Sequence, residues 1–277
     1  MTDRYAVIGN PVAHSKSPLI HAEFARQTGH DISYGALLAP LDGFRAAVLG
    51  FRDAGGSGLN VTLPFKHEAW RLADRRSERS ERARAANTLT FNAGVVAGDN
   101  TDGVGLVRDI EGNLGFGLSG KRLLVLGAGG AAWGIGLPLL AQGVARLTIA
   151  NRTVSRAEEL RRHLGEFANV VGCGFEDLAG TQFDLVINAT SAGLSDEAPA
   201  IPKAVFAPGA LAYEMVYGKA TPFMAFARAC GARVADGLGM LVEQAAESFF
   251  IWRGVRPETA PVIKMLRMKD RGSRIED

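Results

Sequence analysis

The chain has 277 residues, a length that suits two domains better than one. Hydrophobic residues make up 47% of it and charged residues 22%, as in ordinary globular proteins. The formal net charge of +2 gives no electrostatic reason to expect nucleic acid or a membrane surface as a partner.

The cysteines are too few for a disulfide framework. Cys173 and Cys230 have no partner at the spacing of metal ligands, and the five histidines do not cluster with them. We therefore expect buried free thiols, a reducing compartment and no metal. The N-terminus runs into a strand-like segment without a signal-peptide pattern, and no apolar run is long enough to span a bilayer. These features predict a cytoplasmic protein.

The first half of the chain alternates apolar, strand-like runs with helix-like segments. Strands are predicted over residues 5–9, 32–38, 58–62 and 95–98, and helices over 17–29 and 41–54. Ser17 is predicted to cap the first helix, with Pro18 at its first position. The stretch 74–84 mixes Arg, Glu and Ser, which indicates a solvated helix face. Strands that alternate with helices predict βαβ units and a mostly parallel sheet.

The second half shows the same alternation more regularly. Strands are predicted over residues 122–126, 146–150, 183–189 and 210–217, and helices over 131–142, 155–164, 240–253 and after Pro257. This order is typical of a doubly wound, Rossmann-type domain. The composition shifts to a glycine-rich connector over 103–120. We therefore predict a two-lobed α/β protein, with one domain over 1–102 that is completed by helices of 238–277, and a Rossmann-type domain over 103–237.

A glycine-rich loop follows the predicted strand over 122–126. Gly127-x-Gly129-x-x-Ala132 lies between a strand and a helix, the context in which this pattern indicates a dinucleotide site. Gly127 allows a tight turn, Gly129 lets the backbone approach a pyrophosphate, and Ala132 lets the helix pack close to the strand. The phosphates are expected at the helix N-terminus. A glycine turn without a ligand is the alternative. The expected cofactor contacts are Gly127, Ala128, Gly129, Gly130 and Ala131.

The end of the next predicted strand indicates which dinucleotide binds. NAD sites usually carry an Asp or Glu there for the ribose hydroxyls, whereas this chain has Asn151, Arg152 and Thr153, with Arg156 close behind. A guanidinium can bind a 2′-phosphate bidentately, and a carboxylate would repel it. The sequence therefore favours NADP(H). The alternative is that Arg152 and Arg156 are ordinary surface arginines at a helix start.

Polar residues gather at the predicted strand ends of the first domain. In an open parallel sheet this edge borders the ligand crevice, so these residues predict a pocket for a small polyhydroxylated substrate. They are Ser15, Ser17, Asn60, Thr62, Lys66, Asn87, Thr88 and Asp102. Ser15 and Ser17 precede a helix N-terminus, which suits a substrate carboxylate. Ser17 could equally be a helix cap alone, and Lys66 could be a surface lysine.

These segments together resemble the shikimate dehydrogenase family, in the order of its motifs. The substrate-domain motifs are matched by residues 14–18, 60–66, 86–88 and 98–103. The nucleotide-domain motifs are matched by residues 127–131, 151–153, 188–191, 217 with 221–223, and 239–244. The resemblance covers about residues 5 to 260.

The resemblance implies NADPH-dependent reduction of 3-dehydroshikimate to shikimate, in the synthesis of aromatic amino-acid precursors. It implies that Lys66 and Asp102 are the catalytic pair. The first domain would then bind the substrate and the second NADP(H). The implied substrate contacts are Ser15, Ser17, Asn60, Thr62, Asn87, Tyr217 and Gln244. The implied cofactor contacts beyond the glycine loop are Asn151, Arg152, Thr153, Arg156, Thr190, Ser191, Gly237 and Met240.

The chemistry of the pair suits this reaction. Hydride delivery to a ring carbonyl leaves a developing alkoxide that must be protonated. The ammonium of Lys66 can donate that proton, and in the reverse direction its amine can accept one. A carboxylate at Asp102 would keep the ammonium charged and in position.

Three positions depart from the family pattern. Glu214 stands where Asp is frequent, Trp133 is bulky for its place after the glycine turn, and an alanine pair precedes Asn87 where a glycine is common. None of these departures removes a catalytic group of the family.

Two other functions fit the same residues less well. A quinate or dual quinate/shikimate dehydrogenase keeps the same lysine–aspartate pair but tends to have NAD-compatible residues at positions such as Arg152. A non-catalytic sensor of shikimate-like acids or NADP is disfavoured because Lys66 and Asp102 are both retained. The sequence leaves open whether the protein is a monomer or a homodimer.

Overall fold

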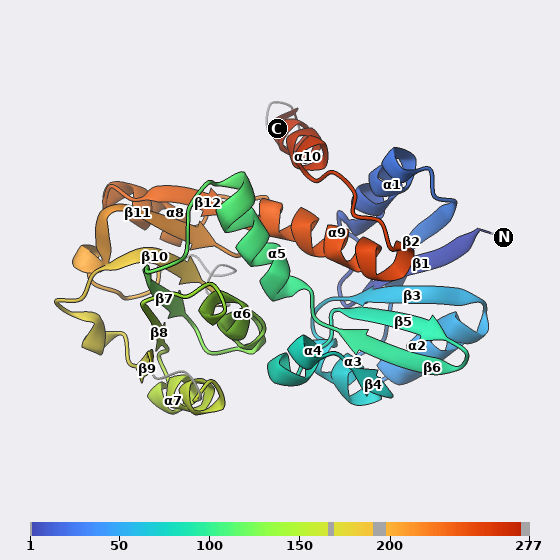
Figure 1. Ribbon diagram of the computed structural model, residues 1–277, viewed down its shortest axis with the longest axis horizontal. Helices are drawn as coiled ribbons and strands as arrows, with labels where there is room; N and C mark the ends of the chain where they lie inside the picture. The colour runs from blue at the N-terminus through green and yellow to red at the C-terminus, as the bar shows by residue number, and fades with distance from the viewer. Residues whose placement is uncertain (1, 166–168, 191–197, 273–277) are drawn as a thin grey trace. The chain divides into compact units, whose positions relative to one another are not determined.

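The computed structural model describes residues 2–165, 169–190 and 198–272, and the chain divides into two compact units. Unit 1 comprises Met1–Gly105 and Leu241–Asp277, and unit 2 comprises Leu106–Met240. Each unit has one six-stranded sheet with helices packed on it (Figure 1). The prediction of an α/β fold with two mostly parallel sheets is therefore confirmed.

The sheet of unit 1 has the strand order β2-β1-β3-β5-β6-β4. The strands are β1 (Asp3–Gly9), β2 (Ile32–Leu38), β3 (Gly56–Val61), β4 (Arg75–Arg76), β5 (Thr88–Asn92) and β6 (Val95–Asp99). β5 pairs antiparallel with both β3 and β6, and the other pairings are parallel. The hairpin between β5 and β6 turns at Ala93 and Gly94, which both have positive φ, as a two-residue hairpin turn requires.

Helices cover both faces of this sheet. They are α1 (Ser17–Thr28), α2 (Phe44–Asp53), α3 (Lys66–Leu72), α4 (Glu78–Ala83), α9 (Leu238–Arg253) and α10 (Ala260–Gly272). Leu59 and Val61 of β3 share a buried apolar cluster with Phe44 of α2. Because successive side chains of a strand alternate between faces, Asn60 points to the opposite face, where its amide contacts Ser248 of α9.

The sheet of unit 2 has the order β12-β11-β10-β7-β8-β9, and all its pairings are parallel. This is the order of a doubly wound dinucleotide-binding fold, with the switch point between β7 and β10. The strands are β7 (Arg122–Leu126), β8 (Arg146–Ala150), β9 (Val170–Cys173), β10 (Phe183–Asn188), β11 (Phe206–Glu214) and β12 (Arg233–Asp236).

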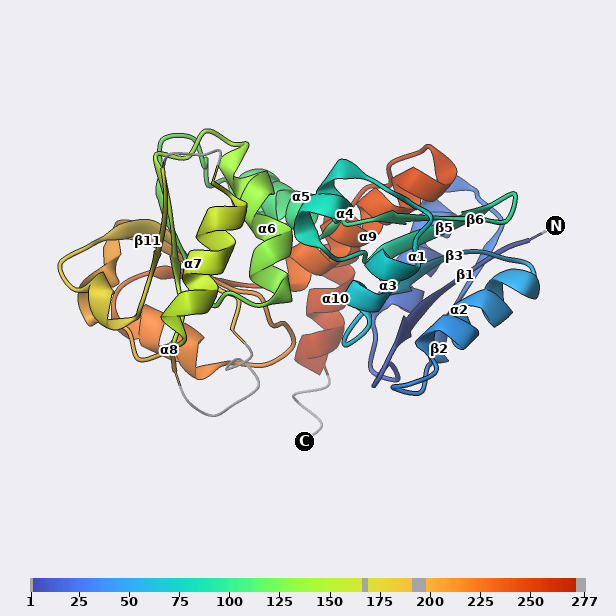
Figure 2. The same ribbon diagram turned by 90° about the horizontal axis from the view of Figure 1, so that it is seen from below.

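The helices of unit 2 lie on both faces of its sheet. They are the end of α5 (Asp102–Arg108) with the π-helical turn Asp109–Asn113, α6 (Gly130–Leu140), α7 (Val154–His163), α8 (Pro222–Ala229) and the 3₁₀ turns Glu176–Leu178 and Lys203–Val205. α6 and α7 lie side by side on one face (Figure 2), where Leu123 packs with Leu139 and Leu160. Leu124 points to the other face and packs with Phe223 of α8.

Three local predictions were wrong. The N-cap of α1 is Lys16 rather than Ser17, and Ser15 instead accepts a hydrogen bond from the Ser17 N–H at 3.3 Å. The stretch 74–84 is not simply a solvated helix face, because Arg79 turns inward to two carboxylates. The thiols Cys173 and Cys230 are partly exposed rather than buried. In the described ranges, no helix is both long enough and apolar enough to cross a membrane.

Candidate active site

Lys66 and Asp102 lie in direct contact at one edge of the unit 1 sheet. Lys66 opens α3 just after β3, and Asp102 opens α5 just after β6. The Nζ of Lys66 lies 2.6 Å from Oδ2 of Asp102. Phe65, which is fully buried and stacks on Phe44, anchors the start of α3. The lysine side chain is 30% exposed and the aspartate 12%, so the ammonium remains accessible to solvent and the carboxylate is mostly covered.

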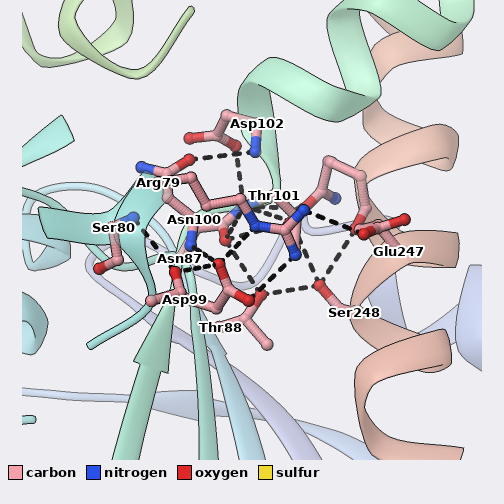
Figure 3. Close-up of polar contacts among 12 residues, drawn as sticks. Arg79, Ser80, Asn87, Thr88, Asp99, Asn100, Thr101, Asp102, Glu247 and Ser248 are labelled. Atoms are coloured by element: carbon pink, nitrogen blue, oxygen red, sulfur yellow. Dashed lines mark hydrogen bonds and ion pairs between the residues drawn. The ribbon is translucent and has the colours of Figure 1, made fainter. Parts of the chain in front are cut away.

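Two further hydrogen bonds fix Asp102, and a third holds its neighbour Asn87. Its Oδ1 accepts a hydrogen bond of 2.9 Å from Nδ2 of Asn87, and its N–H donates to Oδ1 of Asn100 at 3.1 Å (Figure 3). The Oδ1 of Asn87 in turn accepts the N–H of Thr101 at 2.8 Å. Because each carboxylate oxygen has a donor of its own, the plane of the Asp102 carboxylate is fixed towards Lys66.

Gln244 joins the same network from α9. Its Oε1 accepts a hydrogen bond of 3.2 Å from Nδ2 of Asn87, and its Nε2 donates to the carbonyl of Leu241 at 2.8 Å. The hydroxyl of Ser248, one turn further along α9, donates to the carbonyl of Gln244 at 3.0 Å. The contacts therefore bring Lys66, Asp102, Asn87 and Gln244 into one cluster.

Asn60 lies beneath this cluster and has protein partners at both ends of its amide. The hydroxyl of Tyr34 donates to its Oδ1 at 2.7 Å. Its Nδ2 donates to Oγ of Ser248 at 2.9 Å and to the carbonyl of Asn87 at 3.2 Å. Burial raises the pKa of Tyr34 well above its ordinary value, and a hydrogen bond with Ser17 offsets only part of that rise. Tyr34 is thus a neutral donor that fixes the orientation of the Asn60 amide.

The other predicted substrate residues differ in how far they are exposed to solvent. Ser17 is buried near Tyr34, and Ser15 and Thr62 are partly exposed. Tyr217 belongs to unit 2, partly exposed after β11. The sequence missed Tyr34, whose position in β2 carries no local signal of a polar partner.

A buried histidine packs against the ring of Tyr34. The His21 ring stacks on the Tyr34 ring, with centroids 4.1 Å apart and an interplanar angle of 5°. Burial lowers the pKa of His21 to about 3, and the nearby Asn60 amide offsets only part of this effect. Neither ring nitrogen has a hydrogen-bond partner among the residues described. His21 is therefore a neutral ring at physiological pH.

A second, charged set lies on the α4 side of the cluster. Arg79 donates to both oxygens of Asp99, at 2.5 and 3.0 Å, and to Oε1 of Glu247 at 3.0 Å. The same carboxylate of Asp99 accepts the N–H of Asn100 at 2.6 Å. Figure 3 shows these side chains converging from α4, β6 and α9. Sequence reasoning missed this set because its members are far apart in the chain.

The glycine loop of unit 2 has the geometry of a dinucleotide site. Gly127 has φ of 100°, and a Cβ there would lie 3.0 Å from the carbonyl oxygen of Ala189, so a glycine is needed where the loop passes the end of β10. Gly129 and Gly130 are exposed, and a Cβ on either would meet nothing within 4 Å. The N–H groups at the start of α6 are therefore open to an anion. Ala128 is buried and Ala131 is exposed.

The end of β8 carries two exposed arginines. Arg152 and Arg156 flank the start of α7, and in the described part of the chain neither side chain has a hydrogen bond or an ion pair. The Nδ2 of Asn151 donates to the carbonyl of Thr153 at 2.9 Å, which closes the turn before α7. Two guanidinium groups without carboxylate partners suit a dianionic phosphate.

The remaining predicted cofactor residues lie at the ends of β10 and β12. Thr190 donates to Oδ1 of Asn188 at 2.7 Å, and Ser191 lies outside the described residues. Gly237 and Met240 are both buried, and a Cβ on Gly237 would lie 2.2 Å from the carbonyl oxygen of Met215. No site for a metal ion, formed by three or more His, Cys, Asp or Glu side chains, occurs among the described residues.

Glu214, one of the departures from the family pattern, is fully buried and has several hydrogen-bond donors. Its Oε2 accepts from Asn188 at 2.9 Å and from the hydroxyl of Thr221 at 2.8 Å, and its Oε1 accepts the N–H of Val216 at 3.1 Å. The longer side chain thus holds both ends of the segment that bears Tyr217. Trp133, another departure, packs on His163 of α7 with ring centroids 4.5 Å apart.

Three family models match successive parts of the chain. The model for the shikimate dehydrogenase substrate binding domain matches residues 7–89, and the model for shikimate / quinate 5-dehydrogenase matches residues 110–196. The model for the shikimate 5'-dehydrogenase C-terminal domain matches residues 237–267. The matches follow one another along the chain and extend over both units.

Known proteins match over nearly the full length. Shikimate dehydrogenase (NADP(+)) of Nitrosospira multiformis is 60% identical over 96% of this chain and 98% of its own. An Ael1 enzyme from Pseudomonas putida has a TM-score of 0.93 and 53% identity, covering 96% and 98% of the two chains. Shikimate 5-dehydrogenase of Thermus thermophilus, in complex with NADP(H) and shikimate, has a TM-score of 0.86 and 33% identity, covering 96% and 99%. This chain therefore belongs to the shikimate dehydrogenase family.

Proposed function

We propose that this protein catalyses the reversible, NADP(H)-dependent reduction of 3-dehydroshikimate to shikimate, a step in the synthesis of aromatic amino-acid precursors. The observation that carries the proposal is the ion pair of Lys66 and Asp102, 2.6 Å apart, whose carboxylate is oriented by Asn87. Family membership and the relatives named shikimate dehydrogenase (NADP(+)) support the choice of substrate and cofactor. We further propose a cytoplasmic protein that is a monomer or a homodimer.

Unit 1 is proposed to bind the substrate. The hydroxyls of Ser15 and Ser17 lie at the start of α1, where helix N–H groups favour a substrate carboxylate. Thr62 and Gln244 are partly exposed beside the Lys66 pair and suit the substrate hydroxyls. Tyr217, from unit 2, is proposed as a further contact. Asn60 and Asn87 keep their proposed place in this site, but their amides also have protein partners, so part of their effect is to fix the side chains around them.

The proposed catalytic step is a proton transfer at Nζ of Lys66. One N–H of the ammonium is directed to Oδ2 of Asp102, which leaves two N–H groups for the substrate oxygen. As the carbonyl carbon gains a hydride, the oxygen becomes an alkoxide, and Lys66 gives it a proton. In the reverse direction the amine of Lys66 takes the proton of the hydroxyl while the adjacent C–H loses its hydride. The 30% exposure of Lys66 allows water to restore the proton between turnovers.

Unit 2 is proposed to hold NADP(H), and its residues fit that group. Gly129, Gly130 and the start of α6 would hold the pyrophosphate, because their backbone is open and presents unpaired N–H groups. Arg152 and Arg156 would hold the 2′-phosphate, with Asn151 and Thr153 shaping the turn. When bound, NADPH supplies the hydride for the reduction. The other proposed contacts are Gly127, Ala128, Ala131, Thr190, Ser191, Gly237 and Met240.

The direct test follows nicotinamide absorbance with purified protein. Shikimate and quinate are each supplied with NADP+ and with NAD+. We expect fast turnover with shikimate and NADP+ only. Comparable rates with quinate or NAD+ would assign the protein to the dual-specificity dehydrogenases, and no turnover with any pair would favour a sensor that binds shikimate-like acids without catalysis.

A further inference from the structure

We propose that Arg79 is a positioning residue for the reaction, acting on Asp102 through Asp99 and on Gln244 through Glu247. The inference rests on the proposed function of the Lys66–Asp102 site. Arg79 belongs to α4, and its guanidinium reaches that site through other side chains. It is bound by Asp99 and Glu247, and the three residues are here called the Arg79 bridge (Figure 3).

The first arm of the bridge leads to Asp102. The guanidinium binds both oxygens of Asp99, at 2.5 and 3.0 Å, so it fixes the plane of that carboxylate. Oδ1 of Asp99 also accepts the N–H of Asn100 at 2.6 Å, and Oδ1 of Asn100 accepts the N–H of Asp102 at 3.1 Å. The backbone at Asp102 is therefore placed by a carboxylate that Arg79 orients.

The second arm leads to Gln244. The third donor of Arg79 binds Oε1 of Glu247 at 3.0 Å, and Arg256 binds the other oxygen of Glu247 at 2.7 Å. Gln244 lies three residues before Glu247 on α9, so the two side chains share one helix face. The same guanidinium thus ties the end of β6 to α9, next to the point where Asn87 donates to both Asp102 and Gln244.

The charges of the Arg79 bridge indicate that it positions side chains precisely and does not serve only to hold β6 and α9 together. The side chains of Arg79, Asp99 and Glu247 are only 27%, 19% and 12% exposed, so forming the bridge removes charges from water. Apolar side chains could join β6 to α9 without that cost. A planar guanidinium with three directed donors fixes distances and angles, which a lysine or an apolar contact cannot do equally well.

The test compares kcat and KM for shikimate at saturating NADP+ in the full-length protein. We expect Arg79→Gln to lose on the order of 10- to 100-fold in kcat, because misplacing a catalytic group by about 1 Å costs about 100-fold. Arg79→Lys keeps the charge and should regain only part of the loss. Arg26→Gln is the matched control, since Arg26 is an exposed arginine paired with Glu23 in its own helix, and its kinetic constants should equal those of the wild type.

Variants at the two arms distinguish positioning from loss of stability. Asp99→Asn should lower kcat more than it raises KM, and Glu247→Ala should raise KM more than it lowers kcat. These two variants also decide the matter if Arg79→Gln does not fold. Unchanged kcat and KM in Arg79→Gln, or equal changes of both constants at both arms, would overturn the inference. Wild-type protein is measured first, and absence of turnover there would refute the proposed function and this inference with it.

Discussion

Replacing His21 with phenylalanine should remove an acid-sensitive part of the stability of unit 1. His21 is fully buried against Tyr34, and burial lowers its pKa from an ordinary 6.5 to about 3. Between these two values the unfolded chain binds a proton that the folded protein excludes. The contribution of His21 is therefore fully present above about pH 6.5 and is lost as the pH falls towards 3.

The size of the effect follows from the two pKa values. Each pH unit inside the window changes the free energy of unfolding by about 1.4 kcal/mol, so wild-type protein should lose about 2 kcal/mol to His21 on going from pH 7.5 to 5. Phenylalanine keeps a flat ring for the stack on Tyr34 and has no proton to bind. The difference in unfolding free energy between wild type and His21→Phe should therefore shift by about 2 kcal/mol in favour of the variant across that range.

Urea unfolding at pH 7.5, 6.5, 5.5 and 5 would measure this difference. In a Trp133→Phe background the remaining tryptophans, Trp70 and Trp252, both belong to unit 1, so fluorescence reports on the unit that contains His21. His14→Asn serves as the control because His14 is exposed. If His21→Phe and wild type lost the same free energy between pH 7.5 and 5, the assignment of His21 as a buried neutral ring would be wrong.

Three further predictions concern the proposed site. Lys66→Ala should lower kcat by about 10²- to 10⁴-fold, the usual contribution of a positioned acid or base, with a smaller change in the KM of shikimate; wild-type kcat in this variant would refute the role. Replacing Arg152 and Arg156 together by alanine should lower kcat/KM for NADP+ by about 10²- to 10⁴-fold and leave the NAD+ reaction almost unchanged, since each of the two lost charged hydrogen bonds costs about 1.5–3 kcal/mol; equal losses with both cofactors would contradict the 2′-phosphate assignment. Tyr34→Phe removes the 2.7 Å donor to Asn60 and should cost about 1–3 kcal/mol of unfolding free energy in urea, and an unchanged midpoint would show that the amide finds another donor.

The regular parts of the fold could be predicted from apolar runs alone. The strands at residues 32–38, 122–126 and 146–150 have the bounds that the sequence predicts, because each is a short continuous run closed by a change of composition. β5 (Thr88–Asn92) was not predicted, because apolar and polar residues alternate only weakly along it. It also begins in the motif at Asn87 and Thr88, which was interpreted as part of the substrate site. Its turn at Ala93 and Gly94 also lacks the usual Asn-Gly or Asp-Gly signal of a hairpin.

The candidate site could be predicted only where its polar residues directly follow the ends of strands. Lys66 and Asp102 follow β3 and β6, and strand ends of a parallel sheet converge, so their contact agrees with the sequence pattern while their roles remain predictions. Tyr34 lies in the middle of a strand, and its partner is 26 positions away. Arg79 and Glu247 are separated by 168 positions. A charged segment has the same composition whether one of its arginines faces water or a carboxylate, so its inward orientation needed the fold.

Around the proposed active site of unit 1, the most buried of the polar groups named here are neutral, whereas the charged Lys66 is partly exposed to solvent. His21 is fully buried and neutral, the amides of Asn87 and Asn60 are only 2% and 5% exposed, and the neutral phenol of Tyr34 is partly exposed. The charged Lys66 lies at the edge, 30% exposed. Because a charge costs far more to bury than an amide, neutral groups can supply rigidity where water is absent, and the ion pair keeps access to solvent. As the proposed acid, Lys66 must lose and regain a proton in every turnover, and this requires contact with solvent. The same placement that keeps the charge out of the buried interior therefore also allows water to reprotonate the lysine.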